Sequence, residues 1–319
     1  MKKIISVFAA AAAAVSCLCA CGSKEYSDIN SAASPDKLKI VTTIFPEYDW
    51  VKEITGDNNA DITLMLDNGV DLHSYQPTAE DILTISSCDM FVYIGGESDE
   101  WIEDALKEAA NKDMVVLNLL DILGSDAKEE EIIEGMQGSV EEAEYDEHIW
   151  LSLKNAKVLC RAIANSLSEL DSENASSYNS NANAYIEKLS ALDDEYTAAV
   201  DSAPVKTLLF GDRFPFRYLT DDYGLDYYAA FSGCSAETEA SFETILFLSQ
   251  KARELELNSI IQIEGSNEKI AETIKENSDI QNILTLDSMQ AVTAEDISNG
   301  VTYLSIMDKN LDVLKKALM

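Results

Sequence analysis

The chain of 319 residues has few basic side chains, and this scarcity limits the partners it can bind. It carries 23 Lys and Arg against 58 Asp and Glu, so its formal net charge is -35 at pH 7. We expect no nucleic-acid partner, because phosphate backbones repel an acidic surface and no stripe of Lys and Arg interrupts it. The same negative charge attracts cations.

The chain also lacks the motifs of most familiar enzymes. It contains no GxSxG, no P-loop, no GxGxxG after a strand and no HExxH. Beyond the N-terminal segment, no stretch approaches the ~18 apolar residues of a membrane helix. With only 13 Gly and 5 Pro and 46% hydrophobic residues, the composition is that of a globular protein. The length fits about two domains of roughly 150 residues.

The N-terminal segment has the pattern of an export signal. Lys2 and Lys3 precede an apolar stretch over residues 4–14, and Leu18-Cys19-Ala20-Cys21 follows it. These four residues resemble the bacterial lipobox, which implies cleavage before Cys21 and lipidation of its sulfur. We therefore expect a lipoprotein signal peptide over 1–20, a tether over 21–36, and a mature protein that is extracytoplasmic and lipid-anchored to the bacterial cell membrane. The alternative is an ordinary signal peptide cleaved at another small residue.

Three cysteines remain outside this segment, Cys88, Cys160 and Cys234. They lie far apart and form no CxxC spacing, so neither a disulfide framework nor a thiolate zinc site is indicated. We expect them to be small buried residues of the core.

Eight short β-branched or aliphatic runs alternate with segments that suit helices, which predicts two α/β lobes with parallel sheets. We expect a first lobe over 37–172, a linking helix over 173–202 and a second lobe over 203–319. The predicted strands are 38–43, 61–66, 90–94 and 114–119 in the first lobe, and 207–210, 225–230, 259–263 and 282–286 in the second.

The predicted linking helix is the longest helical pattern of the chain. Residues 174–201 contain no Gly or Pro, and apolar side chains recur at helical spacing from Tyr178 to Tyr196. A helix of this length spans roughly 40 Å, so it could tie both lobes together, with Pro204 marking its end. The alternative is a surface helix inside one domain.

The chain has only two histidines, and each lies in a polar loop beside acidic residues. His73 lies in Asp71-Leu72-His73-Ser74-Tyr75 and His148 in Asp146-Glu147-His148-Ile149-Trp150. Open α/β sheets bind ligands beyond the carboxyl ends of their strands, where both loops are predicted. Imidazole and carboxylate groups suit zinc, manganese or iron, and a neighbouring acid can fix the ligating tautomer. A metal site is therefore the natural hypothesis, with core or solvent-facing histidines as the alternative.

Several separated motifs carry a family resemblance in the same order along the chain. They are IVTTIF at 40–45, GVDLHSYQPT at 69–78, DMFVYIGG at 89–96, EHIWLS at 147–152 with Asn155-Ala156, and YLSIM at 303–307 with Asn310-Leu311. Together they resemble the zinc/manganese ABC-transporter solute-binding lipoproteins. The resemblance covers nearly the whole mature chain and implies two lobes joined by a single long helix.

This resemblance implies a set of metal ligands. His73 and His148 match the family's two first-lobe ligands. The third family ligand aligns with Arg213, which cannot bind a cation, so a shift of one residue to Asp212 is an alternative. The fourth falls near Asp287, although a gapless register places Gln290 there, and Glu264 is a further candidate. Around these ligands, the expected supporting residues are Asp71, Asp146 and Arg213. Arg213 could pair with Glu264 and thereby adjust the charge of the site.

The resemblance also implies a function. We expect a receptor, not an enzyme, that captures Zn²⁺ between its lobes and delivers it to an ABC permease and its ATPase, as a monomer. Alternatives are Mn²⁺ or iron as the ligand, a surface adhesin with a degenerate metal site, and a metal-dependent hydrolase. An adhesin needs an exposed aromatic patch, for which Phe214-Pro215-Phe216-Arg217-Tyr218 is the mild candidate. The acidic loop 126–147 is expected to be solvated and mobile, although it could also collect cations.

Overall fold

Two parallel four-stranded sheets form the framework of the chain in a computed structural model, which describes residues 37–319 except 57–59, 139–143 and 236–238. The predicted signal peptide, the tether and Cys21 lie outside the described residues. Within the described residues, no helix is long and apolar enough to cross a membrane.

The first sheet has the strand order β2-β1-β3-β4, and all its neighbours are parallel. The central strand β3 is buried on both faces, so its sequence MFVY is a continuous apolar run rather than an alternating one. The elements are β1 (Leu38–Thr42), α1 (Phe45–Thr55), β2 (Ala60–Leu64), α2 (Ala79–Ser86), β3 (Met90–Tyr93), α3 (Trp101–Lys107), β4 (Val115–Asn118) and α4 (Leu119–Leu123).

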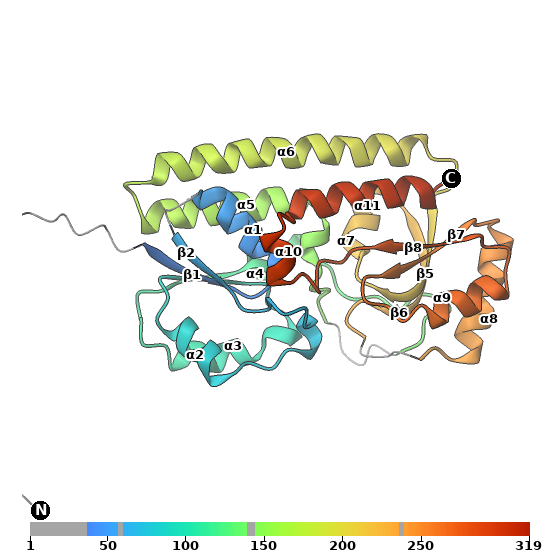
Figure 1. Cartoon of the computed structure of the whole chain (residues 1–319), viewed down its shortest axis with the longest axis horizontal. Coiled ribbons are helices and arrows are strands. Elements are labelled where there is room, and N and C mark those ends of the chain that lie inside the picture. The colour runs from blue at the N-terminus through green and yellow to red at the C-terminus, as the bar shows by residue number, and fades with distance from the viewer. Residues whose placement is uncertain (1–36, 57–59, 139–143, 236–238) are drawn as a thin grey trace, which may run out of the picture. The chain divides into compact units, whose positions relative to one another are not determined.

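The second sheet repeats this arrangement with the order β6-β5-β7-β8 (Figure 1). Its elements are β5 (Thr207–Phe214), α7 (Arg217–Tyr223), β6 (Asp226–Ser232), α8 (Phe242–Glu254), β7 (Ser259–Ile263), α9 (Lys269–Glu276), β8 (Asn282–Leu286) and α10 (Ala294–Ser298). All eight predicted strands are present, which confirms the predicted α/β fold with two parallel-sheet lobes.

Strand β5 is longer than its sequence predicts. An irregularity between Phe210 and Arg213 shifts the register with β6, and pairing then resumes at Arg213 and Phe231. A bulge of this kind re-aims side chains without ending the strand. Asp212 and Arg213 therefore lie within a strand, and not at the start of a helix.

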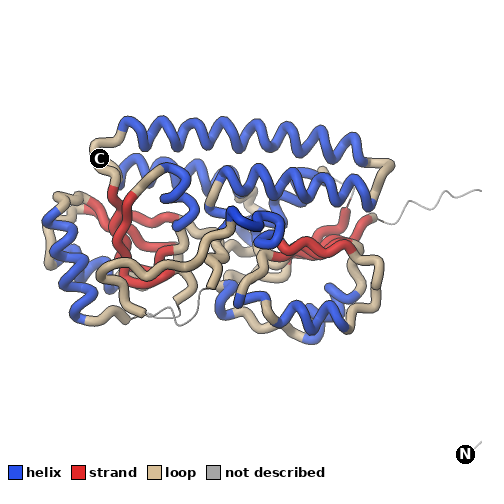
Figure 2. Tube along the Cα trace, turned by 180° about the vertical axis from the view of Figure 1, so that it is seen from behind, coloured by secondary structure: helices blue, strands red, loops and turns tan. Residues whose placement is uncertain are grey.

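A layer of long helices lies over both sheets, as Figures 1 and 2 show from opposite sides. It contains α5 (Leu153–Leu170), α6 (Ala175–Ser202) and the last helix, α11 (Tyr303–Ala317). The single long helix α6 runs along the length of both lobes and buries the predicted apolar positions, among them Tyr178, Tyr185, Leu189, Leu192 and Tyr196.

Helix α11 also reaches the first lobe, although the sequence assigns it to the second. The backbone N–H of Tyr303 donates to Asp49 of α1 at 3.0 Å, and its hydroxyl donates to the carbonyl of Trp150 at 2.6 Å. One hydrophobic cluster contains Ile40 of β1 and Phe210 of β5. Because the two lobes share this core, the boundaries 37–172, 173–202 and 203–319 stay predictions.

The aromatic run considered as an adhesive patch is buried. Phe214, Phe216 and Tyr218 have exposed fractions of 3%, 0% and 2%. The Tyr218 hydroxyl accepts a hydrogen bond from the backbone of Lys128 and donates one to the carbonyl of Asp146. This run therefore positions the segment before His148 and offers no adhesive surface.

The described parts of the acidic loop contact the rest of the chain, while Asp126, Glu129, Glu131, Glu134 and Glu144 are exposed, as expected for a solvated loop. Its mobility stays a prediction. Glu129 pairs with Tyr145, and the backbone of Gln137 donates to Ala230 at the edge strand β6. Glu131 forms an ion pair with Arg217 at 2.8 Å. Backbone pairing and this ion pair offset the mutual repulsion of the carboxylates.

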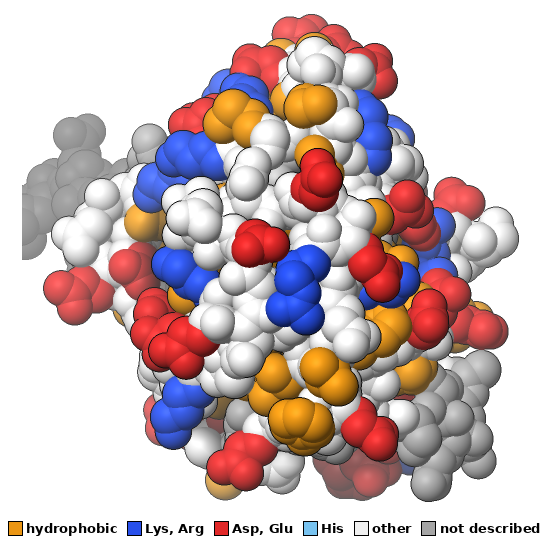
Figure 3. All heavy atoms as spheres, turned by 90° about the vertical axis from the view of Figure 1, so that its right-hand side faces the viewer, with side chains coloured by type: hydrophobic (Ala, Val, Ile, Leu, Met, Phe, Trp, Pro, Cys, Tyr) orange, Lys and Arg blue, Asp and Glu red, His pale blue; other side chains and the backbone are white. Residues whose placement is uncertain are grey.

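The end of the molecule at the second sheet has a mixed surface. Figure 3 shows Lys and Arg side chains interspersed with Asp and Glu on this face, with small groups of hydrophobic side chains between them. No continuous basic patch is present on the face shown.

Candidate metal centre

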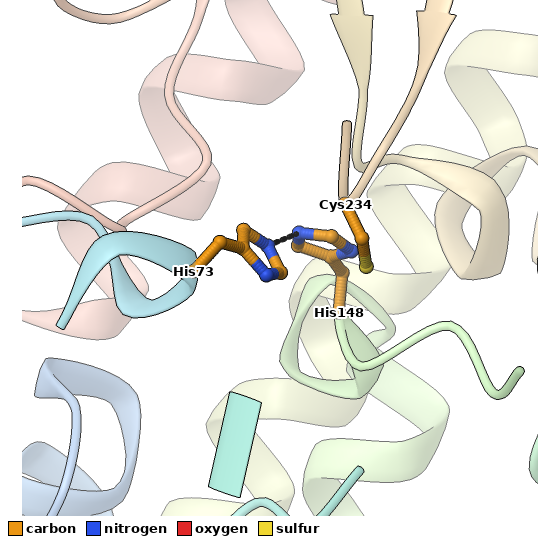
Figure 4. A group of neighbouring side chains, drawn as sticks. All are labelled: His73, His148 and Cys234. Atoms are coloured by element: carbon orange, nitrogen blue, oxygen red, sulfur yellow. Dashed lines mark hydrogen bonds between the residues drawn. The ribbon is translucent and has the colours of Figure 1, made fainter. Parts of the chain in front are cut away.

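Two short turns bring the histidines together although 75 positions separate them. His73 lies in a 3-10 turn, Leu72–Ser74, whose N-cap Asp71 accepts the backbone N–H of His73 at 3.0 Å. His148 immediately precedes a second 3-10 turn, Ile149–Leu151. The Nε2 atoms of the two imidazoles lie 3.2 Å apart (Figure 4).

The other ring nitrogen of each histidine faces oxygen atoms. Nδ1 of His148 lies 2.9 Å from an oxygen of Asp146, and Nδ1 of His73 lies 2.9 Å from Ser98 Oγ and 3.5 Å from Glu147. A carboxylate can only accept, so Nδ1 of His148 carries the proton and its Nε2 presents a lone pair. The Ser98 hydroxyl beside Nδ1 of His73 can accept or donate. When Nδ1 of His73 donates to it, the two Nε2 lone pairs face each other and repel unless a proton or a cation lies between them.

The spacing of the two Nε2 atoms fits a tetrahedral metal ion. Two nitrogens bound at about 2.0–2.1 Å to tetrahedral zinc lie about 3.3 Å apart, and the observed separation is 3.2 Å. Neutral imidazole is also a preferred ligand of zinc. The separation of these two atoms therefore matches that of two ligand positions of a tetrahedral zinc site.

Charge and burial keep at least one imidazole neutral. Burial, with a smaller contribution from the neighbouring His148, lowers the pKa of His73 to about 3. Burial also opposes protonation of His148, but the adjacent Asp146 carboxylate outweighs it and raises the pKa of His148 above its usual value. The pair therefore carries at most one additional proton, and so at most one positive charge, near neutral pH, and a metal ion would replace that proton.

An ion pair from the second lobe supports the His73 turn. The guanidinium of Arg213 in β5 lies 2.6 Å from Asp71, whose other oxygen caps His73. Burial raises the pKa of the Asp71 carboxyl, but Arg213 outweighs this effect and holds the pKa below its usual value. Arg213 thus pairs with Asp71, and not with Glu264 as considered from the sequence.

The three candidate carboxylates of the second lobe lie outside the histidine pair's ligand group and accept local hydrogen bonds. Asp212 accepts the backbone N–H groups of Arg213 and Ile263. Glu264 accepts from the backbone and hydroxyl of Ser288 and from the backbone of Gln290.

Asp287 accepts the backbone N–H of Met289, and burial together with Glu264 raises its pKa to about 6. The roles of Asp212, Glu264 and Asp287 as metal ligands stay predictions.

A cysteine completes the ligand group that the structure does bring together. Within the described residues, one group of His, Cys, Asp and Glu has ligand atoms that all lie within 4.8 Å of one another: His73, His148 and Cys234. The sequence predicts a buried core residue here, and this holds for Cys88 and Cys160, which pack in hydrophobic clusters. Cys234 instead lies in the turn after β6 and is only partly buried.

Two neighbouring cavities flank the centre and share no lining residue. One, of about 340 Å³, is lined by His73, Glu147 and Cys234 among others. The other, of about 290 Å³, is lined by Asp212, Arg213 and Glu264 among others. Asp212 and Glu264 thus line a different cavity from His73.

The fold and this centre agree with a family comparison. Residues 40–317 match the family model of the zinc-uptake complex component A, periplasmic. The chain belongs to this family. The resemblance inferred from the sequence motifs is therefore confirmed.

Named relatives share this architecture. The chain is 31% identical over 320 residues to the zinc-binding lipoprotein AdcA of Streptococcus pneumoniae serotype 4, covering 99% of this chain and 61% of AdcA. It is 30% identical to the high-affinity zinc uptake system protein ZnuA of Bacillus subtilis strain 168, covering 94% and 93%. The Zn(II)-bound ZnuA-like domain of pneumococcal AdcA superposes with a TM-score of 0.72 at 29% identity, covering 88% of this chain and 99% of that domain. The chain thus spans about three fifths of the length of the first of these relatives.

Proposed function

We propose that this chain is an extracytoplasmic receptor that captures Zn²⁺ at His73 and His148 and delivers it to an ABC importer. The observation that carries the proposal is the 3.2 Å separation of the two Nε2 atoms. The Nδ1 atom on the other side of each ring lies beside an oxygen of Asp146 or Ser98. Membership of a zinc-uptake family and relatives named as zinc-binding proteins support it. Imidazole also binds manganese and iron, so Mn²⁺ is the alternative ligand.

Capture and release would require little relative movement of the lobes. The shared hydrophobic core and the long helix α6 stiffen their connection, since domain motion is expected mainly where the interface is small or polar. The cation would instead draw the ligand-bearing loops together. It binds more tightly to the arrangement in which all its ligands reach it, and this difference in affinity favours that arrangement. We expect a small tilt or loop closure on zinc binding.

The finer features of the proposal follow the family. The receptor would be anchored through lipidated Cys21, would act as a monomer, and would meet a permease and an ATPase in the membrane. We expect it to act in zinc uptake and not as an enzyme, because the chain belongs to a zinc-uptake family. Turnover of esters or phosphates that His73→Ala abolishes would favour a hydrolase instead.

Elemental analysis tests the proposal directly. The chain purified without chelator should contain one zinc ion per molecule, and the His73→Ala/His148→Ala variant should contain none. Asp222→Asn is a matched control that changes a half-buried second-lobe acid, which accepts a hydrogen bond from Ser152 and is not a predicted ligand, and it should retain the metal. Zinc retained by the double variant, or manganese in place of zinc in the parent chain, would contradict the proposal.

A further inference from the structure

The turn that follows β6 brings a thiol to the two imidazoles. Gly233 and Cys234 form this turn, directly after the strand ends at Ser232. Cys234 lines the same cavity as His73, and its sulfur and the two imidazoles form the ligand group described above. Figure 4 shows that the three side chains come from three separate segments of the chain.

The backbone of this turn is fitted to His148. A Cβ atom at Gly233 would lie 2.9 Å from Cε1 of His148 and 3.0 Å from the carbonyl oxygen of Phe214. Because both neighbours are buried and fixed, any larger residue would push the turn away from the imidazole. Glycine at this position therefore lets the Cys234 turn lie directly against the His148 ring.

A second contact holds the turn from the other side. The backbone N–H of Cys234 donates to the Glu130 carboxylate at 2.8 Å. Glu130 belongs to the acidic loop, which pairs with β6 through Gln137. The acidic loop thus positions Cys234, and this gives the loop a role that its sequence alone does not reveal.

We infer that Cys234 is the zinc ligand that the second lobe contributes, an assignment that rests on the proposed function. Sulfur bound at about 2.3 Å to tetrahedral zinc lies about 3.6 Å from an imidazole nitrogen at the same ion. In Figure 4 the His148 ring lies between the thiol and His73, so the sulfur must turn toward the Nε2 edge. A change between staggered χ1 positions moves Sγ by about 3 Å, and ligand atoms of the three residues already lie within 4.8 Å of one another. On binding, the S–H bond breaks, the Zn–S bond forms, and the proton leaves to solvent.

A thiolate ligand would also determine which metal the receptor selects. Sulfur favours zinc and other soft or borderline cations, whereas carboxylate and carbonyl oxygens suit manganese, magnesium and calcium. A site with two imidazoles and one thiolate therefore discriminates against manganese. In this chain Arg213 occupies the aligned third-ligand position, and the second-lobe carboxylates already accept local hydrogen bonds. Cys234 would supply the second-lobe ligand in their place and favour zinc.

Cobalt and zinc binding to the full chain test this inference. Co²⁺ adopts tetrahedral zinc sites, and a thiolate ligand gives it a charge-transfer band in the near ultraviolet. The band should be present in the parent chain and in Cys88→Ala and Cys160→Ala, and absent in Cys234→Ser. Loss of a residue that only orients a metal ligand lowers affinity 10- to 100-fold. Because Cys234 would be a ligand itself, zinc affinity should fall at least about 100-fold in Cys234→Ser. A folded Cys234→Ser chain with parental affinity and an intact band would overturn the inference.

A second measurement needs no variant and covers the case in which Cys234→Ser does not fold. Bound zinc should protect Cys234 of the parent chain from alkylation at least tenfold, as read by mass spectrometry of the peptide that contains it. Alkylation that proceeds equally with and without zinc, in a chain shown to hold zinc, would overturn the Cys234 assignment alone. A parent chain that binds no zinc would overturn the proposed function as well.

Discussion

The support that Asp146 gives to His148 leads to a prediction that two substitutions can resolve. One oxygen of Asp146 accepts both the backbone N–H of His148 at 2.8 Å and its Nδ1–H at 2.9 Å. Asp146→Asn keeps an acceptor oxygen but removes the charge. Asp146→Ala removes both, so His148 can move its proton to Nε2, the atom that must bind the metal.

The expected magnitudes follow from these contacts. Loss of a residue that orients a ligating histidine costs 10- to 100-fold in metal affinity, which is about 1.4 to 2.8 kcal/mol. We expect the upper end for Asp146→Ala, because the wrong tautomer becomes available, and the lower end for Asp146→Asn. The alanine variant also leaves the buried backbone N–H of His148 without an acceptor, which costs about 1–3 kcal/mol of folding stability.

Zinc titration against a competing chelator measures the affinities, and thermal unfolding of the metal-free proteins measures the stabilities. Asp222→Asn is a matched control, because this half-buried acid bonds Ser152 away from the histidines. The reasoning predicts the affinity order parent, Asn variant, Ala variant, with the control equal to the parent. It is refuted if Asp146→Ala binds zinc as tightly as the parent chain.

Three further predictions concern the second lobe and the core. Arg213→Met removes the ion pair with Asp71, in which the two side chains are 19% and 25% exposed. A charged hydrogen bond contributes about 1.5–3 kcal/mol, and solvent screens this one. We therefore expect zinc to dissociate about tenfold faster, as measured by stopped flow. Cys234→Asp should lower the ratio of zinc to manganese affinity at least tenfold by calorimetry, and an unchanged ratio would contradict the thiolate assignment. Burial raises the pKa of Asp49 to about 6 from 3.8, so the folded state holds its proton more tightly than the unfolded state, and stability falls as pH rises from about 4 to about 6. Asp49→Asn should therefore unfold like the parent chain near pH 4 but be more stable by up to about 3 kcal/mol above pH 6; a pH-independent difference would refute this.

The features predicted correctly from the sequence are those that local patterns determine. The strands of both sheets are short apolar runs between turns, and the run from Ser259 to Ile263 forms β7 with the same bounds. Helix α6 begins and ends within one residue of the predicted stretch, because no Gly or Pro interrupts it. The two histidines are found because the chain has no others and each has acidic neighbours.

The remaining site residues depend on contacts that no local pattern records. The bulge in β5 places Arg213 in a strand and aims it at Asp71, which gapless alignment cannot reveal. Cys234 reaches the histidines only because Gly233 permits close packing and Glu130, more than 100 positions earlier, holds the turn. The Gly-Cys pair at the end of a predicted strand is the signal that could have indicated it.

X-ray absorption at the zinc edge of the zinc-loaded full chain tests the central claim most directly, because it reports the atoms bound to the ion. The account predicts two imidazole nitrogens at about 2.0–2.1 Å and one sulfur at about 2.3 Å. A spectrum with oxygen scatterers alone and no imidazole signal would contradict it.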